Sequence, residues 1–195
     1  GQILEEITGI SYQDYVHQNI FNPLNMTSSF TNYKDAVNAG HLVQGHEMMF
    51  GFRLPSENNY PDHGIPAGGL VISPQDFPKY IQMLLNKGVS ATGERILQET
   101  SLQKMFSLPS GLNPESPYEY ARGWYNQTIN GRKIVRHGGD LPNFAGEIVI
   151  LPESNLGFAL QFNVNSFMSN VITYFEMVDN VVSILVEEPF EQNWF

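Results

Sequence analysis

The sequence predicts an α+β fold, in which an antiparallel sheet of at least four strands is flanked by helices. Two observations carry this prediction. Apolar residues recur at helical spacing within residues 1–110, whereas residues 111–165 hold runs of β-branched and aromatic residues separated by turn sequences. Residues 166–195 return to helical spacing and end in a tail. At 195 residues, the chain is long enough for one domain and too short for two of ordinary size.

A pair of short helices is predicted at the start of the chain. The first covers residues 3–7 and stops at Gly9, a residue type that often follows the end of a helix. The second begins at Ser11, which forms a reciprocal cap with Asp14, and it ends before Pro23.

Two further helices are predicted in the middle of the chain. In one, Ser73 is the cap and Asp76 the return cap, and the apolar stripe ends at Gly88. The other runs from Thr100 to Phe106, and Thr100 and Gln103 are expected to cap it.

The segment from residue 26 to residue 69 shows no sustained period, so it is expected to form long connections that carry short elements. Within it, Ser56-Glu57-Asn58 is interpreted as a polar turn. His41, His46 and His63 also lie here, and they leave open the hypothesis of a metal site. Their spacing fits no helical or turn-based ligand set, so loop histidines are the preferred interpretation.

Four strand-like runs predict two hairpins. The first hairpin turns at Asn130-Gly131, a dipeptide whose backbone twist suits a two-residue turn. The runs are residues 120–129 and 132–137 in the first hairpin, and 144–151 and 156–164 in the second. Apolar residues from Val171 to Leu185 then fall mostly at helical steps, which predicts a helix that covers one face of the sheet.

Composition excludes several classes of function. The net charge of −10 repels the phosphate backbone, so a general nucleic-acid binder is excluded. The chain has no cysteine, which excludes disulfides, thiolate metal sites and a cysteine nucleophile. A membrane span needs about 18 uninterrupted apolar residues. The longest candidate, residues 167–186, is interrupted by Glu176 and Asp179, so no membrane segment is predicted.

The sequence Arg136-His137-Gly138-Gly139-Asp140 ends a predicted strand, and its two glycines allow a ligand to approach the backbone closely. Other short sequences accompany it in a fixed order. Along the chain they are Gly1–Gly9 with Ser11-Tyr12, Ile20–Thr27, Pro66–Leu70, Gly123-Trp124, His137–Gly139 and Leu151–Glu153.

In that order these sequences resemble the serine β-lactamase and penicillin-binding-protein family, on the side of class C β-lactamases, D-alanyl-D-alanine carboxypeptidases and related esterases. The resemblance extends from Gly1 to about Asn165. It implies the C-terminal part of a β-lactamase/transpeptidase-like fold and a serine hydrolase that forms an acyl-enzyme with a β-lactam, a D-alanyl peptide or an ester. It implies no cofactor. The stretch from His137 to Phe144 resembles a branch on the outer surface of Gram-positive bacteria, which implies an extracellular or cell-surface location.

Members of that family carry a Ser-x-x-Lys with the nucleophile, a Tyr-x-Asn for proton transfer, and a Lys-Thr-Gly or His-x-Gly on a strand. Only the third is found in its place, so residues 1–195 are expected to be an incomplete domain, cut at both ends. The resemblance assigns His137 to the proton-transfer network and the substrate carboxylate, and the backbone N–H of Asp140 to the oxyanion hole. Gly138, Gly139 and Asn143 are assigned to substrate binding.

Ser101-Leu102-Gln103-Lys104 also matches Ser-x-x-Lys, but it comes in the wrong order and on a short predicted helix, so it is interpreted as structural. An alternative function is a non-catalytic relative that binds cell-wall peptides or a protein. Because the elements that complete the family's sheet are expected to be missing, self-association through the exposed face is also predicted.

Overall fold

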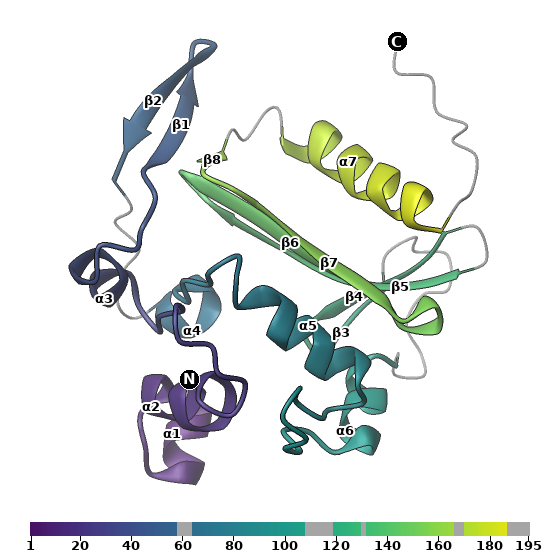
Figure 1. Ribbon diagram of the computed structural model, residues 1–195. Helices are drawn as coiled ribbons and strands as arrows, with labels where there is room; N and C mark the ends of the chain where they lie inside the picture. Colours follow the sequence, from purple (N-terminus) through teal and green to yellow (C-terminus); the bar gives the residue numbers. More distant parts are fainter. Residues whose placement is uncertain (58–63, 108–118, 130–131, 166–169, 187–195) are drawn as a thin grey trace.

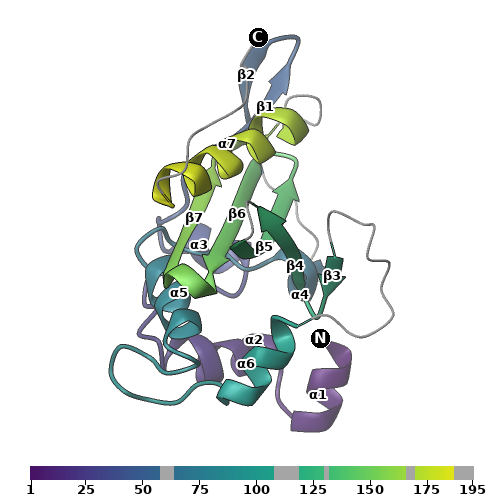
Figure 2. The same cartoon turned by 90° about the vertical axis from the view of Figure 1, so that its right-hand side faces the viewer.

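A five-stranded antiparallel sheet with helices on both faces forms the centre of the computed structural model (Figures 1 and 2). The structure describes residues 1–57, 64–107, 119–129, 132–165 and 170–186. In hydrogen-bonded order the strands are β3 (Glu119–Ala121), β4 (Trp124–Ile129), β5 (Arg132–Leu141), β6 (Phe144–Leu151) and β7 (Leu156–Phe162). The predicted α+β class and the sheet of at least four strands are confirmed.

The prediction of one continuous strand over residues 120–129 is wrong. The backbone turns at Arg122 and Gly123, whose φ angles are 52° and 88°, so β3 and β4 form a tight hairpin. Glycine adopts this left-handed conformation without steric cost, which explains the break. The predicted turn residues Asn130 and Gly131 lie outside the described residues, and Ile129 pairs with Arg132 on either side of them.

The predicted helix pair at the start of the chain is confirmed. Helix α1 (Gln2–Thr8) ends at Gly9, which has a φ of 73°. Helix α2 (Tyr12–Val16) is capped by Ser11, whose Oγ accepts from the Asp14 N–H at 3.1 Å and donates to the Asp14 carboxylate at 2.7 Å. A π-helical turn, η1 (His17–Phe21), continues α2.

The segment between residues 26 and 69 holds more regular structure than predicted. It contains α3 (Tyr33–Asn38), β1 (Gly45–Met49), β2 (Phe52–Ser56) and α4 (Ile65–Gly68). Strand β1 pairs with β2 and also, in parallel, with β8 (Val164–Asn165), which forms a second, three-stranded sheet. The predicted turn is wrong for Ser56, which ends strand β2 and whose hydroxyl donates to Glu47 at 2.6 Å, and Asn58 lies outside the described residues.

Helix α5 (Phe77–Leu85) starts later than predicted: its N-cap residue is Asp76 rather than Ser73, and the Asp76 side chain makes no capping hydrogen bond. Its carboxylate instead accepts from the Ser28 N–H, the Ser29 hydroxyl and, at 2.7 Å, the Lys79 ammonium. Burial by itself would raise the pKa of Asp76, but these hydrogen bonds outweigh burial and lower the pKa below its ordinary value. Asp76 therefore ties the start of α5 to residues 28–29.

Helix α6 (Glu99–Met105) is confirmed as a helix, but the predicted cap is wrong. Its N-cap residue is Gln98, and no side chain makes a capping hydrogen bond. Residues Thr100 and Gln103 therefore do not form the expected pair. The remaining short element is the 3₁₀ turn η3 (Pro152–Ser154) between β6 and β7.

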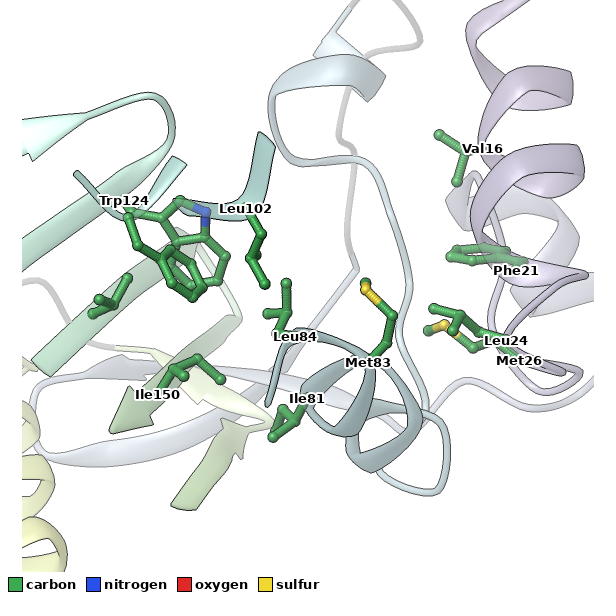
Figure 3. Packing of buried hydrophobic residues seen from close by; sticks show 12 residues of the cluster. Val16, Phe21, Leu24, Met26, Ile81, Met83, Leu84, Leu102, Trp124 and Ile150 are labelled. Carbon is green, nitrogen blue, oxygen red and sulfur yellow. The ribbon is translucent and has the colours of Figure 1, made fainter. Parts of the chain in front are cut away.

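The core lies on both faces of the five-stranded sheet. On one face, α5 and α6 pack against the sheet through a cluster that includes Ile81, Leu84, Leu102, Trp124 and Ile150 (Figure 3). On the other face, α7 (Asn170–Leu185) packs through Val178 and Val182 against Ile134, Val149 and Leu151. The predicted closing helix and its position over one face are confirmed.

Candidate active site

Strand β5 carries His137–Asp140 and extends beyond its neighbour β4. The pairing of β4 with β5 ends at Tyr125 and Arg136, whereas β6 follows β5 as far as Leu141. Among the described residues, no strand pairs with the side of His137–Leu141 that faces away from β6. We call this side the open edge.

The strand register determines which backbone groups face the open edge. The pair Leu141 and Phe144 closes a two-residue turn, so it is a hydrogen-bonded pair and directs the backbone groups of Leu141 toward β6. Successive residues alternate, so the N–H and C=O groups of Gly138 and Asp140 point to the open edge. The pair Ile129 and Arg132 gives the same alternation from the other end of β5.

The two glycines have different surroundings. A Cβ atom at Gly139 would meet no atom within 4 Å, so this position borders open space. A Cβ atom at Gly138 would lie 3.5 Å from Oε2 of Glu147, on the packed side of the strand. The strand is therefore accessible at Gly139 and supported behind Gly138.

His137 is half-buried and belongs to a group of three rings. The Tyr120 hydroxyl lies 3.5 Å from His137 Nε2 in a long hydrogen bond. The ring of His137 lies 5.9 Å from that of Tyr120 and 6.0 Å from that of Tyr125, and the two tyrosine rings are 4.7 Å apart. Neither tyrosine was predicted as a site residue, because residues 120–129 were expected to form one strand. A turn at Arg122-Gly123 places Tyr120 opposite Tyr125, and the glycine at this position is the sequence signal for that turn.

A buried ion network lies behind the strand. Arg136 Nε donates to Glu147 Oε1, and both side chains are only 2% exposed. Arg136 Nη1 lies 3.5 Å from the Asp179 carboxylate of α7 and 3.4 Å from Gln127 Oε1. Burial raises the pKa of Asp179 above its ordinary value, and the charge of Arg136 offsets part of that rise. The network links α7 to the two strands that form the site.

Asn143, assigned above to substrate binding, is 1% exposed in the turn between β5 and β6. Its Nδ2 donates to the carbonyl of Ser56 at 3.1 Å, which joins this turn to β2. Asn165 Nδ2 donates to the carbonyl of Leu141 from β8. The Asn143 side chain thus joins the turn after β5 to β2, and its assignment to substrate binding stays a prediction.

The other sequence candidates lie apart from this group. Ser101 and Lys104 are both exposed on α6. His46 Nδ1 donates to the carbonyl of Asn163 at 3.2 Å, and His41 packs against Phe30. His63 lies outside the described residues, and within the described part of the chain no three metal-ligating side chains gather.

A groove of about 590 Å³ lies between α5 and β7, and it includes no residue of β5. It is therefore separate from the candidate active site. None of the described helices has the length and apolar character that a membrane crossing requires.

The architecture and the His-Gly-Gly strand correspond to the β-lactamase/transpeptidase fold. A family model described as "Beta-lactamase" matches residues 1–176. The chain belongs to this family.

Curated relatives include the unguisins hydrolase ungD' of Aspergillus campestris, 25% identical over 99% of this chain and 37% of the relative. Protein flp of Staphylococcus aureus strain NCTC 8325 is 28% identical over 85% of this chain and 32% of the relative. The chain thus spans about a third of the length of these relatives.

Solved structures share the fold. The octameric penicillin-binding protein homologue from Pyrococcus abyssi has a TM-score of 0.78 and 24% identity, covering 96% of this chain and 40% of that one. The D-amino acid amidase from Ochrobactrum anthropi has a TM-score of 0.76 and 22% identity, covering 96% and 54%. A class C β-lactamase from Rhodobacter sphaeroides has a TM-score of 0.68 and 18% identity, covering 93% and 57%.

Proposed function

We propose that this chain supplies one wall of an acyl-transfer site in a serine hydrolase that cleaves a β-lactam, a D-alanyl peptide or an ester. The open edge is the observation that carries the proposal. An acyl-transfer transition state places negative charge on the former carbonyl oxygen, and fixed backbone donors stabilise that charge. The Asp140 N–H, which the strand register directs to the open edge, is the donor we assign.

The other residues of the wall follow from their positions. Gly139 leaves space in front of the strand for the substrate, and the ring of His137 takes part in proton transfer and in binding a substrate carboxylate. An extended substrate segment bonds to the backbone groups of Gly138 as an added strand.

We propose that the nucleophile and the Tyr-x-Asn group come from a longer parent protein, of which these 195 residues are a part. The relatives matched here are about three times as long as the aligned segment, which leaves room for both motifs. Ser101 is a poor nucleophile, because a serine–lysine pair needs a desolvated lysine and both side chains are exposed.

Intact-mass spectrometry tests this proposal. The parent is expected to gain the mass of a broad β-lactam or a fluorophosphonate, whereas this chain alone gains neither. An adduct on the isolated chain would instead identify Ser101 as an activated serine and overturn the assignment. A folded parent without any adduct would favour the second candidate, a non-catalytic relative that binds cell-wall peptides.

A backbone variant tests the assigned donor directly. Asp140→Pro removes the N–H that faces the open edge and leaves the β6 side of the strand paired. The acylation rate of the parent should fall about 100- to 1000-fold, as when one oxyanion-hole donor is lost. Asp140→Asn keeps the N–H and is the matched control, so an equal loss in both variants would contradict the assignment.

A further inference from the structure

The hairpin β3–β4 places Tyr120 beside His137. Its turn is anchored by Arg122, whose Nη1 donates to the carbonyls of Lys104 at 2.9 Å and Ser107 at 3.0 Å. These carbonyls belong to the end of α6 and the residues just after it, where a cation is favourable. Ala121 and Trp124, on either side of the turn, are both 5% exposed. The hairpin is therefore held by the core on one side and by α6 on the other.

Tyr120 itself remains accessible. Its side chain is 49% exposed and that of Tyr125 is 39% exposed, although each ring contacts His137. Neither ring contributes a buried apolar side chain to the core clusters. Burial in the core therefore does not account for the position of these two rings next to His137.

We propose that Tyr120 is a positioning residue for His137, whose hydroxyl donates to Nε2 and thereby fixes the rotation of the ring and its tautomer. A neutral imidazole carries its proton on either nitrogen, and a hydrogen bond at one nitrogen decides which. A phenol is a weak acid, so its hydroxyl is the better donor of the two partners. The proton of His137 is then held at Nδ1, and Nε2 accepts. The consequence for catalysis rests on the proposed function above, whereas the tautomer does not.

Nuclear magnetic resonance of the histidine ring nitrogens in this chain tests the proposal. The spectra are recorded above the ordinary titration range of histidine, so that the ring is neutral. In the unsubstituted chain, Nε2 should show the shift of an unprotonated nitrogen and Nδ1 that of a protonated one. Tyr120→Phe should move both shifts toward the average of two tautomers.

Tyr125→Phe is the matched control, because it removes a hydroxyl from the neighbouring ring and keeps the ring contact with His137. It should leave the His137 nitrogen shifts unchanged. Arg122→Ala, which frees the hairpin from α6, should produce part of the Tyr120→Phe effect. Unchanged shifts in Tyr120→Phe, or equal changes in both phenylalanine variants, would overturn the proposal.

A second measurement uses the parent protein. Tyr120→Phe should lower kcat for acyl transfer by about 2- to 10-fold, the value of one neutral hydrogen bond, with KM nearly unchanged. If the parent forms no acyl-enzyme at all, the proposed function fails while the ring-nitrogen shifts still decide the role of Tyr120. A fall in kcat without any change in tautomer would assign Tyr120 to the substrate instead.

Discussion

Substitution of Arg136 should destabilise the fold strongly, because it leaves the Glu147 carboxylate buried without the guanidinium. Both side chains are 2% exposed, so water cannot replace the lost partner. Removing one member of such a pair costs about 3–5 kcal/mol. For a domain of this size, about 2–4 °C of Tm is lost per kcal/mol, so Arg136→Met should lower Tm by about 6–20 °C. Asp179 is 31% exposed, so Asp179→Asn should change stability by less than about 1 kcal/mol at neutral pH.

Equilibrium unfolding in urea, followed by circular dichroism, measures these differences. The double variant Arg136→Met with Glu147→Leu removes both charges and should recover most of the lost stability. A buried ion pair rarely stabilises a fold more than well-packed apolar residues of similar volume do. The ion network does not stabilise the strand if Arg136→Met lowers the free energy of unfolding by less than about 1 kcal/mol, or if the double variant is less stable than the single one.

Three further predictions concern single residues. The pKa of Asp76 is lowered, so its contribution to stability is present above the ordinary carboxyl pKa and is lost as pH falls through the lowered value. Asp76→Asn should remove this loss, as measured by urea unfolding at acid pH. Asp179 has a raised pKa, so the native state binds its proton more tightly than the unfolded state does, and stability falls as pH rises through the raised value. Asp179→Asn should abolish this fall in the free energy of unfolding, measured in urea over the same pH range. Gly88 has a φ of 87°, and a Cβ there would lie 2.2 Å from the Leu97 carbonyl oxygen, so Gly88→Ala should cost about 2 kcal/mol or more in thermal melts.

Much of the fold follows from local sequence. The helix pair, the stripe of α5, the β4–β5 and β6–β7 hairpins and the closing helix α7 show clear periodicity or turn signals, and the structure confirms each of them. The β3–β4 hairpin was not predicted. The pairing of β1 with β8 does not follow, because it joins residues about 118 apart in the sequence (His46 with Val164) and neither strand shows a marked pattern alone. The cap at Ser73 was mispredicted for a similar reason, since Asp76 bonds to distant Ser28 and Ser29.

The candidate active site was likewise only partly predictable from local sequence. The His137–Asp140 sequence and its place on a strand could be read from the chain, and the structure puts these residues on β5. The accessibility of these residues could not be predicted, because it depends on the pairing of β4 with β5 stopping at Arg136, one residue before His137. Arg136 and Glu147 each interrupt an apolar strand, which was a signal for a buried pair, but only the register brings them together.

The open edge of β5 and the outer edge of β7 favour different partners, and this yields a last prediction. The open edge of β5 covers only His137–Leu141, carries the charged Asp140 and is followed by Pro142. These features leave room for a short substrate segment but discourage pairing with a whole strand of a second copy. Strand β7 is the last strand of the sheet, it has no charged residue, and the groove beside α5 adds apolar surface. We propose that the isolated chain self-associates through β7. Light scattering should detect a species larger than the monomer, and Gln161→Lys should reduce it, because an edge lysine opposes strand pairing.

Gln103→Lys adds the same charge on the exposed face of α6 and is the control for that experiment. If both lysines act equally, net charge rather than the β7 edge governs association, and a monodisperse unsubstituted monomer would remove the proposal altogether. The comparison matters for the active site as well. A chain that associates through the outer edge of β7 leaves the open edge of β5 free. Strand β6 lies between β5 and β7, and the open edge is the side of β5 that faces away from β6. Association would then block no residue of the proposed site, and the tautomer of His137 should be the same in the monomer and in the larger species.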